Sequence, residues 1–377
     1  MRRCGWALSL GLLATLVAGD ASAFEIRTGF SRGCHEQIAT SAFLRSMDQL
    51  PRFPDSAVPD EEWEGVADAY LGDAGELDRA SRFFLFSVVM GARAPDTEGH
   101  SVTNAQTLRA AQADPGGQYL HCLRAATDDF DAGNASALGG CRAEILASLT
   151  HVADEATLSG GDRAAEVDEI YVTLDIYGVF EVEVWGPAYH LGRALHTLQD
   201  SFAHSLRTAD MRGVVHVMNF EAPLAGRHDE ERDGMAHSEA TDRCGPDGEG
   251  ENRDRYAAAV DASSDLLLVF EPFLRVPEQG VPPARTALDE VLARWLTLTD
   301  PAALGDYTAC TLANDYCDSP WLELARRSPT TPVLSCTVGP APRRSHVPAA
   351  PLVPLVVVAV VGVMRRRARR SLLSEAV

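Results

Sequence analysis

The sequence contains no lysine and little positive charge of any kind. All 33 basic residues of the 377-residue chain are arginine, and 54 acidic residues outnumber them, which makes the formal net charge −21. Residues 24–342 alone carry 24 arginines and 52 acidic residues, a net charge of −28. Such a surface repels polyanions. The composition therefore excludes a protein that binds duplex nucleic acid through a basic face.

Several cofactor signatures are absent as well. The sequence has no phosphate-binding P-loop, no G-x-G-x-x-G dinucleotide motif and no C-x-x-C pair. Without paired cysteines at that spacing, a zinc site built from thiolates is not indicated. The candidates for chemistry are instead histidines and carboxylates.

The first 23 residues have the pattern of a secretory signal peptide. Arg2 and Arg3 precede an apolar stretch from Trp6 to Ala18, and Ala21-Ser22-Ala23 forms a small-residue cleavage site. The apolar stretch is too short for a membrane anchor, which must span about 30 Å. Cleavage after this site would make Phe24 the new N-terminal residue of an exported protein.

The other end of the chain also has a targeting pattern. A linker over 326–346, rich in proline, serine and arginine, precedes a short apolar run and an arginine cluster within 347–370. The basic cluster is expected to stay on the cytoplasmic side, leaving the body outside. With Cys336 in the linker, this region resembles the C-terminal sorting tag of myxobacterial surface proteins. The resemblance implies processing near the cysteine and display at the cell envelope or surface; a permanent single-pass anchor is the alternative.

Cysteine usage agrees with export. Of eight cysteines, one falls in the signal peptide and Cys336 belongs to the tag, which leaves six in the body. An even number in an exported chain predicts up to three disulfides. Neighbouring pairs such as Cys122–Cys141 and Cys310–Cys317 are candidates.

Apolar residues recur every three to four positions through most of residues 24–325, which predicts a single, mostly α-helical domain. A helix starting at Leu77 is expected to stop before Pro95, because proline lacks the backbone N–H. The segment 164–184 contains a β-prone stretch but is assigned to helix, and 214–220 is expected to be a short strand or an extended segment. The predicted helices span 34–50, 77–91, 117–130, 138–158, 164–184, 187–204, 255–274 and 284–298.

The helix predicted over 187–204 carries the most informative motif. His196, Asp200 and His204 project at about 0°, 40° and 80° around the helix axis, on one face along two turns. Apolar residues flank this face, so it is expected to point inward. Buried imidazole and carboxylate groups need partners, and a metal ion would satisfy all three. A hydrogen-bonded His–Asp pair without metal is the alternative.

This segment resembles a known superfamily. Leu191-Gly192, followed by Ala194-Leu195-His196 and Asp200, is similar to the zinc-dependent phospholipase C superfamily, which also contains the single-strand-specific zinc nucleases. The resemblance implies a helical fold of the phospholipase C type and one to three zinc ions. It implies that His196 and Asp200 ligate zinc, and that Asp96 orients or deprotonates the attacking water. The remaining zinc ligands that the resemblance implies are Phe24, His35, Asp96, His100, His204 and His237.

The last ligand position has competitors. The family's terminal His-x-x-x-Glu is not cleanly present, and His228, Glu231, Glu239 and Asp242 lie in the same acidic loop as His237. Among the other histidines, His121 and His151 are expected in packing or at the surface, on amphipathic helices. His190 is expected to point away from the metal face. For His216, core packing, support of the site and metal ligation all remain open.

These features predict an exported zinc-dependent phosphodiesterase, most similar to a phospholipase C, with a phospholipid as the expected substrate. A single-strand nuclease of the same superfamily is a second hypothesis, for which Trp185, Phe202 and Phe220 are the candidates to stack on bases. A third hypothesis is a non-catalytic cell-surface protein with a structural zinc site.

Overall fold

The computed structural model describes residues 33–300, except 61, 72–73, 75–76, 98–99, 102–103, 131, 175–177, 238–250 and 277–280. The chain divides into two units, Met1–Val333 and Leu334–Val377, and every described residue belongs to the first. The predicted signal peptide, Phe24, the linker and the C-terminal apolar run lie outside the described residues. Among the described helices, none is both long and apolar enough to cross a membrane.

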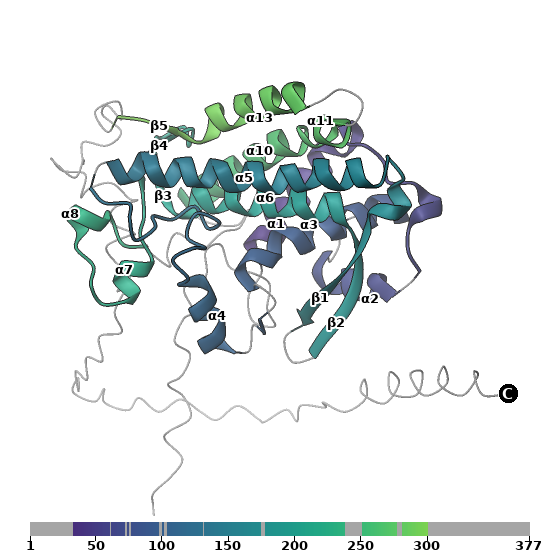
Figure 1. Cartoon of the computed structure of the whole chain (residues 1–377), viewed down its shortest axis with the longest axis horizontal. Helices are drawn as coiled ribbons and strands as arrows, with labels where there is room; N and C mark the ends of the chain where they lie inside the picture. Colours follow the sequence, from purple (N-terminus) through teal and green to yellow (C-terminus); the bar gives the residue numbers. More distant parts are fainter. Residues whose placement is uncertain are drawn as a thin grey trace, which may run out of the picture. The chain divides into compact units, whose positions relative to one another are not determined.

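Three long helices form the centre of the fold (Figure 1): α3 (Arg79–Thr97), α5 (Ala132–Leu158) and α6 (Gly186–Ala203). Helix α6 packs against both of the others and also contacts α1 (Cys34–Ser46) and α10 (Glu251–Leu267). All but three of its residues are buried, so the helix that carries the histidine motif is the central element. The prediction of a mostly helical protein is confirmed.

Helices α3 and α6 approach each other unusually closely, and two glycines make this possible. A Cβ atom on Gly192 would lie 2.1 Å from the Val88 carbonyl oxygen, and one on Gly91 would lie 1.9 Å from the Tyr189 carbonyl oxygen. Any side chain here would force the two backbones apart. The close crossing brings the Ala92 carbonyl within hydrogen-bonding reach of the motif on α6, as described below.

Shorter elements complete the helical body. Helix α2 (Glu62–Leu71) packs against α3, and a set of aromatic rings fills the core beside them. The rings in mutual contact are Phe43, Phe53, Trp63, Phe83, Phe84, Phe86, Trp185 and Phe270. The other helices are α4 (Ala105–Gln112), α7 (Glu221–Leu224), α8 (Glu230–Asp233), α11 (Phe270–Leu274) and α13 (Val281–Trp295).

Two small sheets accompany the helices. Strands β1 (Val167–Leu174) and β2 (Gly178–Trp185) form an antiparallel hairpin, in which Val167 pairs with Trp185. Strand β4 (Gly213–Val217) pairs antiparallel with β3 (Ser205–Arg207) and parallel with β5 (Thr297–Leu298). The short strand predicted near 214–220 is therefore confirmed by β4.

The helix predicted over 164–184 is wrong, because this segment forms the β1–β2 hairpin. In β2, Val182 and Val184 are buried while Glu181 and Glu183 alternate with them, which is the period of two expected for a strand. The end predicted for the 77–91 helix is also wrong. Helix α3 continues through Pro95 to Thr97, since a proline in the last turn removes only one helical hydrogen bond.

The helix predicted over 117–130 is wrong as well. These residues form a series of turns that begins near Asp114-Pro115-Gly116-Gly117, and Cys122 has a left-handed φ of 47°. The predicted Cys122–Cys141 disulfide is confirmed, and it attaches this loop to α5. The other candidate pair, Cys310–Cys317, lies outside the described residues. The disulfide positions the neighbouring His121, which becomes important at the candidate site.

Candidate metal centre

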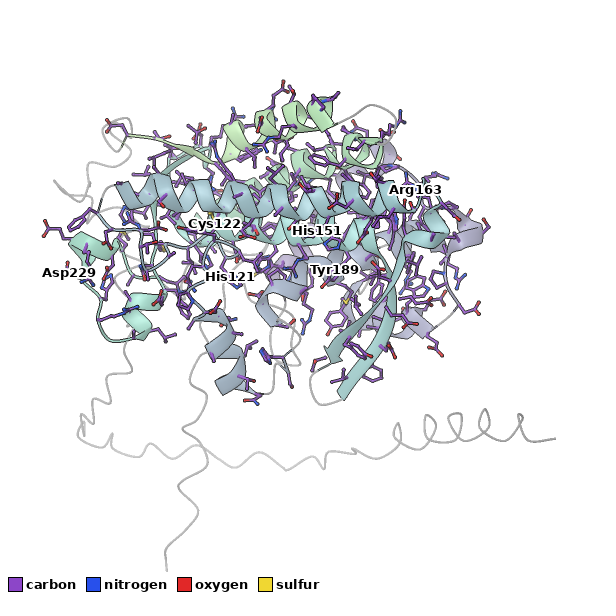
Figure 2. All side chains as sticks on the ribbon, in the orientation of Figure 1. His121, Cys122, His151, Arg163, Tyr189 and Asp229 are labelled. Carbon is purple, nitrogen blue, oxygen red and sulfur yellow. A yellow bond between two sulfur atoms is a disulfide. The ribbon has the colours of Figure 1, made fainter. Side chains whose placement is uncertain are left out.

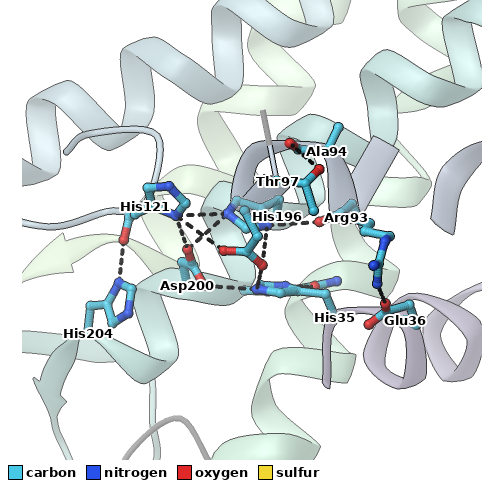
Figure 3. A network of polar contacts seen from close by, with 12 residues as sticks. His35, Glu36, Arg93, Ala94, Thr97, His121, His196, Asp200 and His204 are labelled. Carbon is cyan, nitrogen blue, oxygen red and sulfur yellow. Dashed lines mark hydrogen bonds and ion pairs between the residues drawn. The ribbon is translucent and has the colours of Figure 1, made fainter. Parts of the chain in front are cut away.

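Four side chains from three helices form a buried group that could hold a metal ion (Figure 3). His35 on α1, Asp96 on α3, and His196 and Asp200 on α6 each offer a ligand atom within 4.8 Å of the others, and all four are fully buried. Asp200 lies in the middle, with Oδ1 3.0 Å from His35 Nε2 and Oδ2 3.0 Å from His196 Nε2. All four are among the ligands predicted from the sequence.

The hydrogen bonds of His196 determine which of its nitrogens carries a proton. Nδ1 lies 2.8 Å from the Ala92 carbonyl oxygen, which can only accept, so Nδ1 is the donor. Burial lowers the pKa of this imidazole to about 3, so it is neutral and Nε2 carries a lone pair. That lone pair faces an oxygen of the Asp200 carboxylate, and two acceptors at 3.0 Å need a cation or a proton between them.

His35 has the same arrangement on the opposite side of Asp200. Its Nδ1 lies 2.7 Å from Gln199 Oε1, and the Gln199 amide is oriented by a bond from Nε2 to Ser263 Oγ. The Nδ1–H therefore donates, and Nε2 points at the carboxylates of Asp200 and Asp96, at 3.0 Å and 3.7 Å. An imidazole whose Nδ1–H is held by a neighbouring acceptor while Nε2 faces carboxylates has the usual arrangement of a histidine metal ligand.

The buried carboxylates and imidazoles of the group shift one another's pKa values. Burial lowers the pKa of His35, but the Asp200 and Asp96 carboxylates outweigh it and raise the pKa to about 9. Burial raises the pKa of Asp96 to about 8. Burial acts in the same direction on Asp200, yet the imidazoles of His196 and His35 hold its pKa well below the usual range. Without a metal ion, protons must therefore supply the positive charge that the carboxylates need.

Asp96 supports the metal assignment independently. Both of its carboxylate oxygens are buried, and neither accepts a hydrogen bond from any described residue. Buried carboxylates without hydrogen bonds are costly unless a cation is present. Two imidazoles and two carboxylates are a donor set that suits zinc and related divalent ions, so the residues fit a bound metal.

His121 belongs to this group, although the sequence prediction placed it in packing or at the surface. Its Nδ1 lies 3.0 Å from Asp200 Oδ2, 3.1 Å from His196 Nε2 and 3.8 Å from Asp96 Oδ1. The prediction was wrong because it placed His121 on a helix over 117–130, and this helix does not form. The Asp114-Pro115-Gly116-Gly117 turn signal and the adjacent Cys122 were the features that could have identified a constrained loop here.

Two further predicted ligands line a pocket next to the buried group. His204 follows the last residue of α6, and its Nδ1 is hydrogen-bonded to the His121 carbonyl oxygen. Its ring lies edge-on to His237, with 4.8 Å between the ring centroids. His204, His237, His121 and Asp96 share the lining of a pocket of about 240 Å³, part of which is open to solvent. This pocket connects the buried group to the surface.

His216 supports the loop that carries His237. Its Nε2 accepts a hydrogen bond from the Met235 N–H at 3.0 Å, and burial beside Arg124 lowers its pKa to about 3. Gly234, with φ of 79°, packs so tightly that a Cβ atom would lie 2.7 Å from His216 Nε2. The His216 nitrogen that accepts this bond serves the loop, so the structure assigns it to core packing and support.

Other predicted residues are not brought together in the described part of the chain. His100 is exposed and is not in the four-residue group. His190 pairs with Glu155 at 3.0 Å and stacks on His151, away from the group as predicted. His228 bonds the Gly234 carbonyl. Phe24, Glu239 and Asp242 lie outside the described residues, and Glu231 is exposed.

No protein-family model, curated protein or solved structure matches the chain. The functional argument therefore rests on the geometry of the site.

Proposed function

We propose that this protein is an exported, zinc-dependent phosphodiesterase of the phospholipase C type. The observation that carries the proposal is the placement of two imidazole Nε2 atoms, on His35 and His196, each 3.0 Å from an oxygen of the Asp200 carboxylate. The buried Asp96, whose oxygens accept no hydrogen bond from described residues, adds a second carboxylate. The substrate class, the zinc and the exported location come from the sequence resemblance and the terminal signals.

The residues divide between two neighbouring positions. His35, Asp96, His196 and Asp200 would hold one zinc ion, and His121 is close enough to join them. His204 and His237, which line the adjacent pocket with Asp96, are the candidates for a second ion. When bound, zinc lowers the pKa of a coordinated water and stabilises negative charge at phosphorus.

Asp96 belongs to the buried group and also lines the pocket, which suits it for handling the attacking water. Its Oδ2 lies 3.7 Å from His35 Nε2, and the same residue lines the pocket with His237. A carboxylate in this place can accept a proton from water and orient it toward a substrate that enters the pocket. His204 and His237, the candidates for a second ion, border the same space.

The nuclease hypothesis receives less support from the geometry. Trp185 and Phe202 are fully buried in the core, so neither offers a face for stacking on a base. Of the three aromatic candidates, Phe220 alone lines the pocket. One ring is a small platform for a single strand.

The test is to measure zinc per chain and hydrolysis on the same secreted protein. The substrates are a chromogenic phosphodiester, phospholipids in mixed micelles and single-stranded DNA, assayed with the wild type, Asp200→Asn and Asp261→Asn. Asp261 is an exposed partner of Arg45 and serves as the matched control. We expect phospholipid cleavage that is lost with zinc in Asp200→Asn alone. Stoichiometric zinc without hydrolysis of any substrate would instead identify a structural zinc protein.

A further inference from the structure

A second and larger pocket lies between α3, β1 and α6. It offers about 860 Å³ of space, part of it open to solvent, compared with about 240 Å³ beside the metal group. Arg93 and Thr97 line it from α3, Tyr171 from β1, and Tyr189 and Arg193 from α6. Figure 2 labels Tyr189 beside the hairpin.

The lining of this pocket is positively charged in a strongly acidic protein. Among the described residues that line it there are two arginines and no carboxylate, although the chain as a whole carries 54 acidic and 33 basic residues. The charge of Arg93 is largely compensated, because Nη1 lies 3.0 Å from Glu36 Oε1 and both side chains are 3% exposed. The excess charge that a ligand would meet therefore belongs mainly to Arg193.

Arg193 has no partner among the described residues. It is half-buried, and it makes no hydrogen bond or ion pair within the described part of the chain. A guanidinium group removed from part of its water without an acceptor is unfavourable, and its fork of N–H donors matches a phosphate group. Tyr171 and Tyr189 line the same space and add aromatic surface. The Tyr171 hydroxyl is engaged with Glu181, and the Thr97 hydroxyl donates to the Ala94 carbonyl.

The pocket shares two helices with the metal centre. On α6, Arg193 precedes His196 by three residues, a rise of about 4.5 Å along the helix axis. On α3, Thr97 directly follows Asp96.

We propose that this pocket binds a phosphate monoester whose organic part is apolar or aromatic, with Arg193 as the main anion-binding residue. A phosphate monoester carries close to two negative charges near neutral pH. Arg193 supplies the uncompensated positive charge, and Tyr171 and Tyr189 accept the organic part. The site is formed by residues outside the metal group, so its existence does not depend on hydrolysis at that centre.

The test uses isothermal titration of the zinc-loaded, full-length protein with phenyl phosphate. We expect Arg193→Gln to weaken binding roughly tenfold or more, Arg193→Lys to weaken it less, and Arg212→Gln to leave it unchanged. Arg212 is the matched control, because it is exposed and lies in the turn before β4. Equal affinity of Arg193→Gln and the wild type, or no binding by the wild type, would overturn the proposal.

Two further titrations separate possible sources of the signal. Phosphate can also bind zinc, so Asp200→Asn is titrated as well; retained binding there, with loss in Arg193→Gln, assigns the signal to this pocket. Loss in Asp200→Asn with full binding in Arg193→Gln places the ligand at the metal centre and refutes the pocket site. Binding to vesicles that contain phosphatidic acid is compared with binding of phenyl phosphate. The comparison establishes whether the pocket binds the phosphate group of a lipid or that of a soluble molecule.

Discussion

Replacing Asp200 by asparagine tests the metal centre most directly. The substitution keeps the size of the side chain and removes its charge. The Asp200 carboxylate lies 3.0 Å from nitrogen atoms of His35, His121 and His196, so every imidazole of the group loses its nearest anion. Its effect on stability has two parts, which can be measured separately.

The first part is present without metal. Burial lowers the pKa of the His35 imidazole, but the Asp200 and Asp96 carboxylates raise it from 6.5 to about 9. The interaction therefore stabilises the folded protein fully below pH 6.5 and loses this effect as the pH rises through 9. At pH 7, breaking this buried pair is expected to cost about 3 kcal/mol. A purely structural His–Asp pair would produce the same loss, so this measurement alone does not decide the role.

The second part depends on zinc. A ligand that binds only the folded state, present at a thousand times its dissociation constant, adds about 4 kcal/mol of stability. For a domain of this size, that corresponds to an increase in melting temperature of roughly 10 °C. We expect this increment in the wild type and in Asp261→Asn, and we expect most of it to disappear in Asp200→Asn, since one of four ligands is lost.

The assay is a set of melting curves with excess zinc and with a chelator, combined with elemental analysis of each dialysed protein. The difference between the two curves is the relevant quantity, because it cancels the cost of breaking the pair. Asp200→Asn that keeps one zinc per chain and the full increment would refute the assignment of Asp200 as a ligand.

Three further predictions follow from the same contacts. Zinc should bind more tightly as the pH rises from 6 to 9 and should release protons, because the pKa values of His35 and Asp96 are raised to about 9 and about 8 and both must deprotonate; titration in buffers of different ionisation enthalpy measures this. Cys141→Ser opens a disulfide between residues 19 positions apart and should cost about 3 kcal/mol in denaturant unfolding, together with weaker zinc binding. Gly192→Ala should cost at least about 1–3 kcal/mol and lower zinc content, whereas Gly139→Ala, with no neighbour within 4 Å, should stabilise α5 by about 0.5–1 kcal/mol.

The sequence predicted correctly those features of the site that depend on residues within a single helix. The spacing of His196 and Asp200 on one helix predicted that both point in the same direction, since four residues return a side chain nearly to the same face. The same reasoning failed for 164–184, which was predicted to be helical. This segment forms a hairpin, because the hairpin buries Val182 and Val184 on one face. A short apolar segment fits both the helical period of 3.6 residues and the strand period of two residues. The elements that pack against the segment then determine which structure it adopts.

His121 shows the limit of the sequence at the site itself. Its place depends on a loop whose path is set by turns and by the Cys122–Cys141 disulfide, which joins it to α5. No periodicity describes such a path, and the contact with Asp200 spans 79 residues of sequence. His100, which the order of the motif favoured, is exposed instead.

The sequence by itself determined the acidic, lysine-free composition, the mostly helical architecture, the central His196–Asp200 motif and one disulfide, because these depend on composition or on spacing along one element. Only the tertiary structure decided which distant residues complete the metal group. The close α3–α6 crossing at Gly91 and Gly192 brings Ala92 against His196. The fold also leaves Arg193 in a pocket without a partner among the described residues, since the pairing of a charge depends on what packs around it.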